Sequence, residues 1–215
     1  MSFRLSASLA TLAVWLGGCG VHPDPSFGPT ESTAFPVVGG EVASPDDYPS
    51  AVALTDSSGE PCCTGTLVAP KTVVTAAHCL DQGSGDVWIA YGVTHPASLS
   101  QSELHEVVKA LPHPDYDPMA KKDPDGMGLV NDIGVVVLKE PIAGAKVTPV
   151  LPPDEIDPVL YPNRDIHIAG YGIYEMPWTS GDLYKAVTPH VRHVDTEMLA
   201  GKPGKPDTCN GDSGG

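Results

Sequence analysis

Short runs rich in valine and isoleucine recur along the chain from Val37, and each is closed by glycine, proline, aspartate or serine. Runs of this length bounded by turn residues are typical of β-strands, and no long amphipathic helical pattern competes with them. Glycine and proline, 23 of each in 215 residues, supply the turns without a collagen-like period of three. The chain is therefore predicted to be all-β, a barrel or a sandwich. The expected strands are Ala51–Thr55, Thr64–Val68, Val73–Ala76, Val87–Tyr91, Glu106–Leu111, Ile133–Leu138 and Ile166–Ala169, with one helical turn over Ala76–Leu80.

The charge balance is strongly acidic, with 27 Asp and Glu against 12 Lys and Arg and a formal net charge of −15. A nucleic-acid-binding protein needs a basic surface to neutralise phosphates, so no nucleic-acid partner is expected. Basic peptides and proteins are the partners that such a charge favours.

The first residues have the pattern of an export signal. Arg4 precedes a short apolar run, Leu5–Leu16, which is too short for a stable transmembrane helix. The run ends in Leu-Gly-Gly-Cys at Cys19, which resembles a bacterial lipobox, and ordinary signal cleavage near the same small residues is the alternative. Residues 1–19 are thus expected to be a signal peptide and residues 20–36 a Pro-rich tether or propeptide. We expect an exported protein, either secreted or a cell-envelope lipoprotein tethered to the membrane through a lipidated Cys19.

Three local motifs together supply the groups needed for nucleophilic catalysis. They are Thr-Ala-Ala-His-Cys at 75–79, Asn-Asp-Ile at 131–133 and Gly-Asp-Ser-Gly-Gly at 211–215. A serine hydroxyl becomes a good nucleophile when an imidazole removes its proton, and a carboxylate fixes the tautomer of that imidazole. Flanking glycines let backbone N–H groups approach a developing oxyanion. The motifs therefore predict hydrolysis of amides.

From about Val37 to the last residue, this set of motifs resembles the trypsin/chymotrypsin family of serine proteases, including its chain order of His, Asp and Ser. The resemblance implies two six-stranded antiparallel β-barrels over residues 37–215. Family members continue well beyond the catalytic serine, whereas this chain stops two residues after Ser213. We therefore expect a C-terminally truncated protease domain with an incomplete second barrel.

The resemblance also assigns roles. It implies that His78 is the general base and then acid, that Asp132 orients it, and that Ser213 is the nucleophile. The oxyanion hole would be formed by the backbone N–H groups of Gly211 and Ser213. Asp207 falls where trypsin-like members keep the acid of the specificity pocket, and a buried carboxylate there selects Lys or Arg. Peptide or protein substrates cleaved after Lys or Arg are therefore expected.

Activation is the next property that the resemblance implies. The Val-Val-Gly-Gly run that begins at Val37 resembles the mature N-terminus of the family, and Asp212 would receive the new ammonium group after cleavage. The residue before Val37 is Pro36, not the Arg or Lys on which trypsin acts.

Five cysteines are present, and export places them in a disulfide-permissive compartment. Cys63 and Cys79 match the family disulfide that closes the loop of the catalytic His, whereas the pairing of Cys62 and Cys209 stays open. No cofactor or metal is expected, because the acids of the 115–125 loop lack the spacing of an EF-hand. The other histidines, which have no partner spacing, are expected on the surface or in loops: His22, His95, His105, His113, His167, His190 and His193.

Two other functions share these features. A catalytically impaired, protease-like module would bind basic peptides without cleaving them, and an esterase would use the same triad on esters. Labelling with an active-site-directed fluorophosphonate distinguishes the impaired module from an active enzyme, because the labelling reaction requires an activated serine.

Overall fold

The computed structural model describes residues 37, 39–81, 86–119, 130–172, 181–194, 197–201, 205–206, 208 and 212–215. The expected signal peptide and tether, residues 1–36, lie outside these ranges. Within the described ranges, no helix is both long and apolar enough to cross a membrane.

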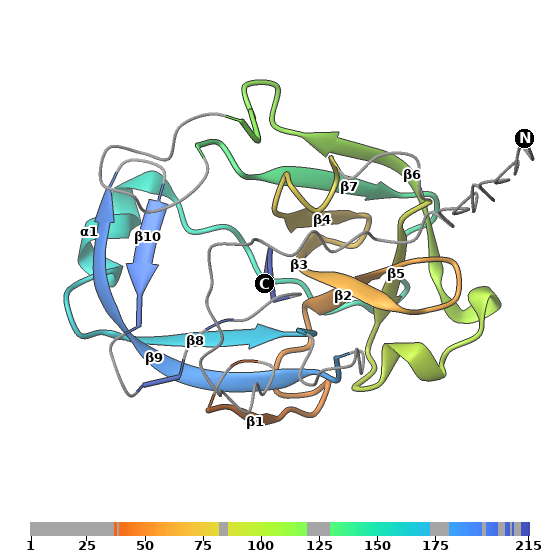
Figure 1. Cartoon of the computed structure of the whole chain (residues 1–215), viewed down its shortest axis with the longest axis horizontal. Coiled ribbons are helices and arrows are strands. Elements are labelled where there is room, and N and C mark those ends of the chain that lie inside the picture. Colours follow the sequence, from red (N-terminus) through yellow and green to blue (C-terminus); the bar gives the residue numbers. More distant parts are fainter. Residues whose placement is uncertain are drawn as a thin grey trace, which may run out of the picture.

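Six antiparallel strands close into a barrel in the order β2-β3-β4-β7-β6-β5 (Figure 1). Their bounds are Ala51–Thr55 for β2, Pro61–Ala69 for β3, Thr72–Thr75 for β4, Trp88–Tyr91 for β5, His105–Pro112 for β6 and Gly134–Leu138 for β7. Closing the sheet on itself leaves none of these six strands at an edge, which satisfies their backbone groups internally.

The interior of the barrel is filled by alternate residues of these strands. In β7, Gly134, Val136 and Leu138 are buried and the two residues between them are only partly buried. This period of two is what a strand with one face on a core requires. Val52, Leu54, Leu67, Val73, Ile89, Val136 and Leu138 are fully buried in one cluster.

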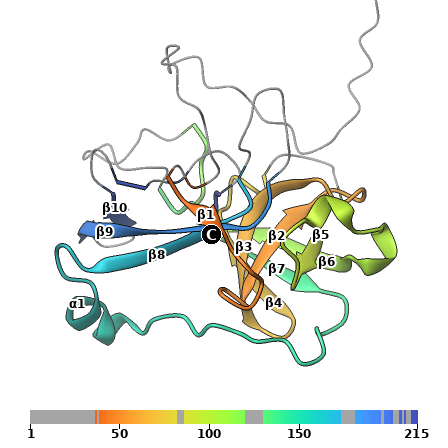
Figure 2. The ribbon, with the colours of Figure 1, turned by 90° about the horizontal axis from the view of Figure 1, so that it is seen from below.

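The second unit is a four-stranded antiparallel sheet that lies beside the barrel (Figure 2). It contains β1 (Glu41–Val42), β8 (Asp165–Gly170), β9 (Tyr184–Val194) and β10 (Glu197–Ala200), and β9 pairs with each of the other three. Along the chain, a short helical segment falls between β7 and β8: the 3₁₀ turn Pro153–Glu155 is followed by α1 (Ile156–Val159).

The all-β prediction is confirmed, and each of the seven expected strands is present with bounds that differ by at most three residues. The expected turn over Ala76–Leu80 is also present, because both Leu80 N–H and Asp81 N–H donate to the Ala77 carbonyl. Strands β1, β9 and β10 were not predicted.

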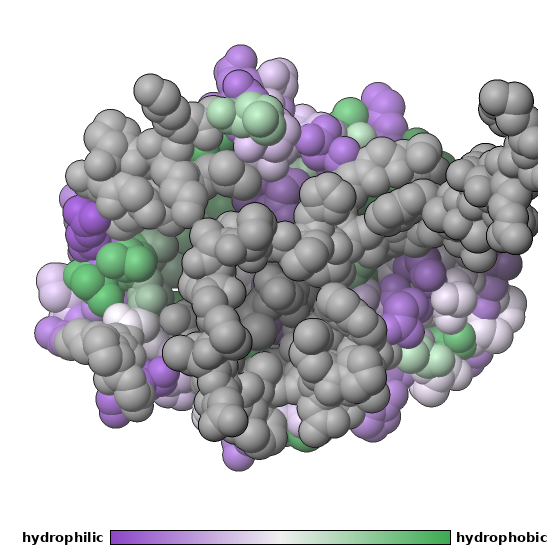
Figure 3. Space-filling view, in the orientation of Figure 1, coloured by the Kyte–Doolittle hydropathy of each residue, from purple (hydrophilic) through white to green (hydrophobic). Residues whose placement is uncertain are grey.

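An apolar patch lies on the outside of the second sheet. Figure 3 shows hydrophobic residues gathered at the left, over β9 and β10, with hydrophilic residues around them. On β10, Met198 and Leu199 leave 47% and 39% of their area exposed. Large exposed side chains of this kind are scattered over many proteins, so the patch alone assigns no function.

Candidate active site

The pairing of β4 with β7 brings two of the predicted site residues together. These strands are antiparallel neighbours, with Thr75 at the end of β4 opposite Gly134 at the start of β7. His78 follows β4 by three residues and Asp132 precedes β7 by two. Because the end of one strand adjoins the start of the other, the turn that carries His78 lies against the segment that carries Asp132.

Asp132 binds His78 through both of its carboxylate oxygens. His78 N–H donates to Oδ1 at 2.8 Å, and the ring Nδ1 lies 2.7 Å from Oδ2. A carboxylate only accepts, so Nδ1 carries the proton and Nε2 keeps its lone pair. Both side chains are partly exposed, at 32% for His78 and 21% for Asp132. The arrangement therefore presents a base whose tautomer and ring orientation are both fixed.

The charge of Asp132 is maintained by its donors. Burial by itself would raise the pKa of the Asp132 carboxyl, but hydrogen bonds from the ring and backbone of His78 and from the Ala77 backbone outweigh it. The net result holds the pKa of Asp132 below its ordinary value of 3.8. Asp132 is thus an anion across the neutral range, as an orienting carboxylate must be.

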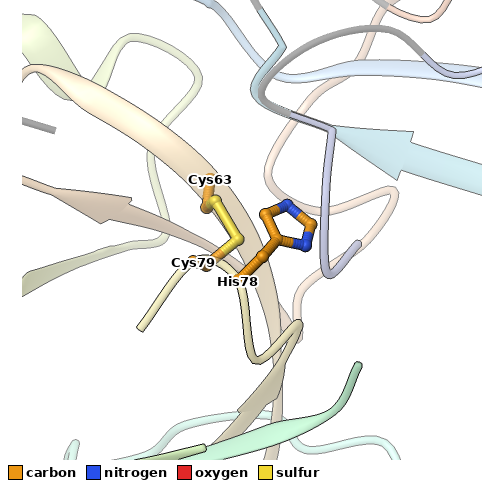
Figure 4. Close-up of side chains that lie close together, drawn as sticks. All are labelled: Cys63, His78 and Cys79. Carbon is orange, nitrogen blue, oxygen red and sulfur yellow. A yellow bond between two sulfur atoms is a disulfide. The ribbon is translucent and has the colours of Figure 1, made fainter. Parts of the chain in front are cut away.

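A disulfide joins the His78 turn to the barrel wall. Cys79 pairs with Cys63 of β3, as the family resemblance implied. Figure 4 shows the imidazole of His78 beside this disulfide. Cys62 is also disulfide-bonded. Cys209, whose pairing the sequence left open, lies outside the described residues.

The segment of Ser213 docks on the same strand. Thr64 N–H, next to Cys63, donates to the Ser213 carbonyl at 2.9 Å, and that carbonyl also lies 3.7 Å from Cys79 Sγ. The serine is thus held beside the disulfide that borders His78. Among the described residues, the Ser213 hydroxyl makes no hydrogen bond to the His78 ring. Such bonds are often long before substrate binds.

Ser213 sits in a tight turn that only glycine allows. Gly215 N–H donates to the Asp212 carbonyl at 3.0 Å, and Gly214 between them has φ +84°. A Cβ on Gly214 would collide with the Thr75 hydroxyl and lie 2.5 Å from the Thr64 carbonyl oxygen. A positive φ combined with this close approach explains why Gly214 follows the serine.

Asp212 is buried and bound from two sides. Its Oδ2 accepts from Val37 N–H at 3.1 Å and its Oδ1 from Gly172 N–H at 2.9 Å. A side chain on Gly170 or Gly172 would collide with the carboxylate, which accounts for both glycines of the Gly-Tyr-Gly segment. Val37 itself is fully buried with φ +40°, an unfavourable value for a β-branched residue.

Thr64 is a contributor that the sequence analysis did not single out. Besides binding Ser213, its hydroxyl accepts from Tyr171 N–H and its carbonyl accepts from the Thr75 hydroxyl. It is fully buried. A threonine in a core strand beside the predicted cysteine was the available signal, but its polar partners are distant in sequence.

Several predicted site residues are not described by the structure. Gly211, expected in the oxyanion hole, Asp207, expected in the specificity pocket, and Cys19, expected to be lipidated, lie outside the described residues. Of the predicted set, the structure brings together His78 with Asp132, Cys63 with Cys79, and Val37 with Asp212, and it places Ser213 beside the disulfide.

A comparison with known protein families tests the resemblance directly. The family model described as Trypsin matches residues 37–215. The chain belongs to the trypsin family. This family consists of serine-type endopeptidases, so the protein is a serine-type hydrolase.

Individual relatives agree with this assignment. The chain is 33% identical to a trypsin from Saccharopolyspora erythraea, in an alignment that covers 83% of this chain and 80% of that protein. It is 28% identical to mouse chymotrypsin-C, over 96% of this chain and 79% of that protein. Among solved structures, mouse neuropsin, a serine protease, superposes with a TM-score of 0.62 at 24% identity, covering 81% of this chain and 79% of that one. The last match shows a shared fold.

Proposed function

We propose that this trypsin-family protein hydrolyses peptide bonds with His78 as general base, Asp132 as its orienting partner and Ser213 as nucleophile. The observation that carries the proposal is the double hydrogen bond between His78 and Asp132, which leaves the Nε2 lone pair available for the serine proton. The reaction begins when Ser213 Oγ attacks the scissile carbonyl carbon as its proton passes to Nε2. The imidazolium formed is stabilised by the Asp132 carboxylate and then protonates the leaving amine.

The oxyanion of the tetrahedral intermediate needs N–H donors that are already in place. Ser213 N–H and Gly211 N–H are the proposed donors. The support is the tight turn at Ser213. The residue before Ser213, Asp212, is buried and accepts a hydrogen bond from Gly172 N–H, which anchors this turn.

The decisive experiment is covalent labelling of the serine. Wild-type protein should react with a fluorophosphonate probe at Ser213, whereas Ser213→Ala and His78→Ala should not react. Ser102→Ala is the matched control, because Ser102 is an exposed serine that has no imidazole partner among the residues the structure describes. Labelling of Ser213→Ala to the wild-type extent would refute the assignment.

We further propose cleavage after Lys or Arg, governed by Asp207, in a chain whose net charge of −15 favours basic substrates. Asp207→Ser should lower kcat/KM for peptides with Arg before the scissile bond much more than for peptides with an aromatic residue there. Equal losses on the two peptides would show that Asp207 does not select the substrate.

Activation is proposed to follow export by the residues 1–19 signal and to use Val37 and Asp212. Cleavage before Val37 would turn the amide that now lies 3.1 Å from Asp212 Oδ2 into an ammonium group, which strengthens this contact by a full charge. N-terminal sequencing of active material tests the proposal: a first residue of Val37 supports it, and full activity in a chain that begins at residue 19 or 20 contradicts it.

A further inference from the structure

Two histidines on β9 face each other at one end of the second sheet. His190 is buried with 1% of its area exposed, and His193 is partly exposed. Their ring centroids are 5.4 Å apart, and His190 Nε2 lies 3.4 Å from His193 Nδ1. The burial of His190 contradicts the expectation that it lies on the surface or in a loop.

A β-bulge creates this pairing. Residues 190 and 193 would point to opposite faces of a regular strand, because side chains alternate with a period of two. Against β10, however, Leu199 pairs with Arg192 and the next residue, Ala200, pairs with His190. Val191 is therefore an extra residue in β9, and it shifts the alternation so that the two imidazoles converge. Bulges re-aim side chains in this way beside functional sites.

The outer nitrogen of each ring faces a group that only accepts hydrogen bonds. His190 Nδ1 lies 3.0 Å from the Tyr161 carbonyl oxygen, and His193 Nε2 lies 3.0 Å from Asp157 Oδ1. Both outer nitrogens therefore carry protons. In the neutral rings, the two inner nitrogens, which face each other, both hold lone pairs. Two facing lone pairs at this separation repel each other unless a cation, either a proton shared by the rings or a metal ion, lies between them.

The separation of the inner nitrogens suits a metal ion. Nitrogen ligands bind Zn²⁺ at about 2.0–2.1 Å, and two of them in tetrahedral geometry lie roughly 3.4 Å apart. The outer contacts are those that orient metal-binding histidines, which donate their second N–H to a carboxylate or a backbone carbonyl. Here the acceptor is a backbone carbonyl for His190 and a carboxylate for His193.

We propose that His190 Nε2 and His193 Nδ1 bind a divalent transition-metal ion of the zinc type, oriented by the Tyr161 carbonyl and by Asp157. Neutral imidazole suits such ions better than it suits Ca²⁺ or Mg²⁺. Water completes the coordination on the exposed side, where His193 and Asp157 leave 27% and 92% of their side-chain areas accessible. Both ligands lie on β9, and the hydrogen bond from His193 to Asp157 connects them to α1, on the sheet side of the molecule and away from the barrel (Figure 1).

Two other histidine clusters among the described residues lack these features. His95 contacts Asp182 but has no second imidazole beside it. His78 lies within ligand distance of Cys63 and Cys79, but their sulfurs are joined in a disulfide and offer no thiolate (Figure 4). These clusters supply the controls for the experiment.

The test is calorimetric titration of ZnCl₂ into the EDTA-treated full-length protein, with thermal unfolding measured in parallel. Wild type should bind one zinc ion through this site and show a higher Tm with zinc. His193→Gln should abolish this binding, and Asp157→Asn, which changes an exposed carboxyl, should weaken it by about 10–100-fold. Circular dichroism verifies that each variant is folded.

His95→Gln and His78→Gln are the controls and should keep the wild-type affinity. Three results would overturn the proposal: no saturable binding by wild type, unchanged binding by His193→Gln, or loss of binding in His78→Gln instead. Cobalt substitution gives a second readout, because the d–d bands of tetrahedral Co²⁺ should appear in wild type and His95→Gln and be absent from His193→Gln.

Discussion

Replacing Asp132 by Asn tests the geometry of the site at a single atom. The amide can still accept from His78 N–H through its oxygen, but its NH₂ group then faces the ring where Oδ2 now lies 2.7 Å from Nδ1. An NH₂ group donates, so Nδ1 must be the unprotonated nitrogen and Nε2 takes the proton. The imidazole then points an N–H at the serine and cannot remove its proton. We expect kcat to fall by about 10⁴-fold, which is the loss that the wrong imidazole tautomer causes in a Ser-His-Asp triad.

The effect on stability should be much smaller. Hydrogen bonds to a charged group contribute about 1.5–3 kcal/mol each when desolvated. Because Asp132 is partly exposed and the amide of the variant would keep both contacts, only the charge assistance is lost, and a decrease of about 1–2 kcal/mol in the free energy of unfolding is expected. Steady-state hydrolysis of an arginine ester and urea unfolding measure the two effects on the same preparation.

Asp182→Asn is the matched control, because Asp182 also binds a histidine, His95, but the pair is outside the proposed site. It should leave kcat within about twofold and stability within about 0.5 kcal/mol of wild type. If Asp132→Asn keeps more than about a tenth of the wild-type kcat while remaining folded, the tautomer argument is wrong.

Three further predictions concern the turn, the disulfide and pH. Gly214→Ala should lower the free energy of unfolding by about 3 kcal/mol, because of a strained φ and a collision with β4. Gly144 has φ +70° but open space around it, so Gly144→Ala should lower this free energy by only about 1–2 kcal/mol in urea unfolding. Equal losses would mean that no collision occurs at Gly214. Replacing Cys63 and Cys79 together by Ala should lower the free energy of unfolding by about 3 kcal/mol, because their sequence separation of 16 residues closes a loop of this size in the unfolded chain; an unchanged Tm would contradict this. The folded-state pKa of Asp132 is lowered, so the contribution of this carboxylate to stability is complete above its ordinary pKa of 3.8 and is lost as pH falls through the lowered pKa. The difference in free energy of unfolding between wild type and Asp132→Asn should therefore shrink only below about pH 4. A difference that vanished by about pH 6 would contradict this pKa shift.

The sequence predicted those parts of the molecule whose signals are local. The barrel strands contain short apolar or β-branched runs, and the motifs at His78, Asp132 and Ser213 each span five residues or fewer. Strand β9 was missed because it contains Lys185, Pro189 and three other basic or imidazole side chains, which break both the apolar run and the alternation. Proline is tolerated there because Pro189 lies just beyond the last residue pair that β9 makes with β10, Ala200 with His190.

The contacts that complete the site were also beyond sequence reasoning. Thr64 and Ser213 are joined by a backbone hydrogen bond, which no side-chain pattern reports. The pairing of His190 with His193 depends on one extra residue in a strand, and nothing in the spacing of the two histidines marks that residue. In both cases, the deciding information is the register of neighbouring strands.

The attachment of Ser213 affects the order in which the parts of the site separate under mild denaturation. His78 and Asp132 are held by adjacent strands of a closed barrel and by a disulfide, so they separate only when the barrel opens. Ser213 is held to that barrel through Thr64, and Asp212 beside it is anchored to Gly172 and Val37, which lie outside the barrel strands. Local opening of this attachment costs less than global unfolding. We therefore expect a latent form in which His78 and Asp132 stay paired and the barrel amides stay protected from exchange, while Ser213 has left its place beside the disulfide.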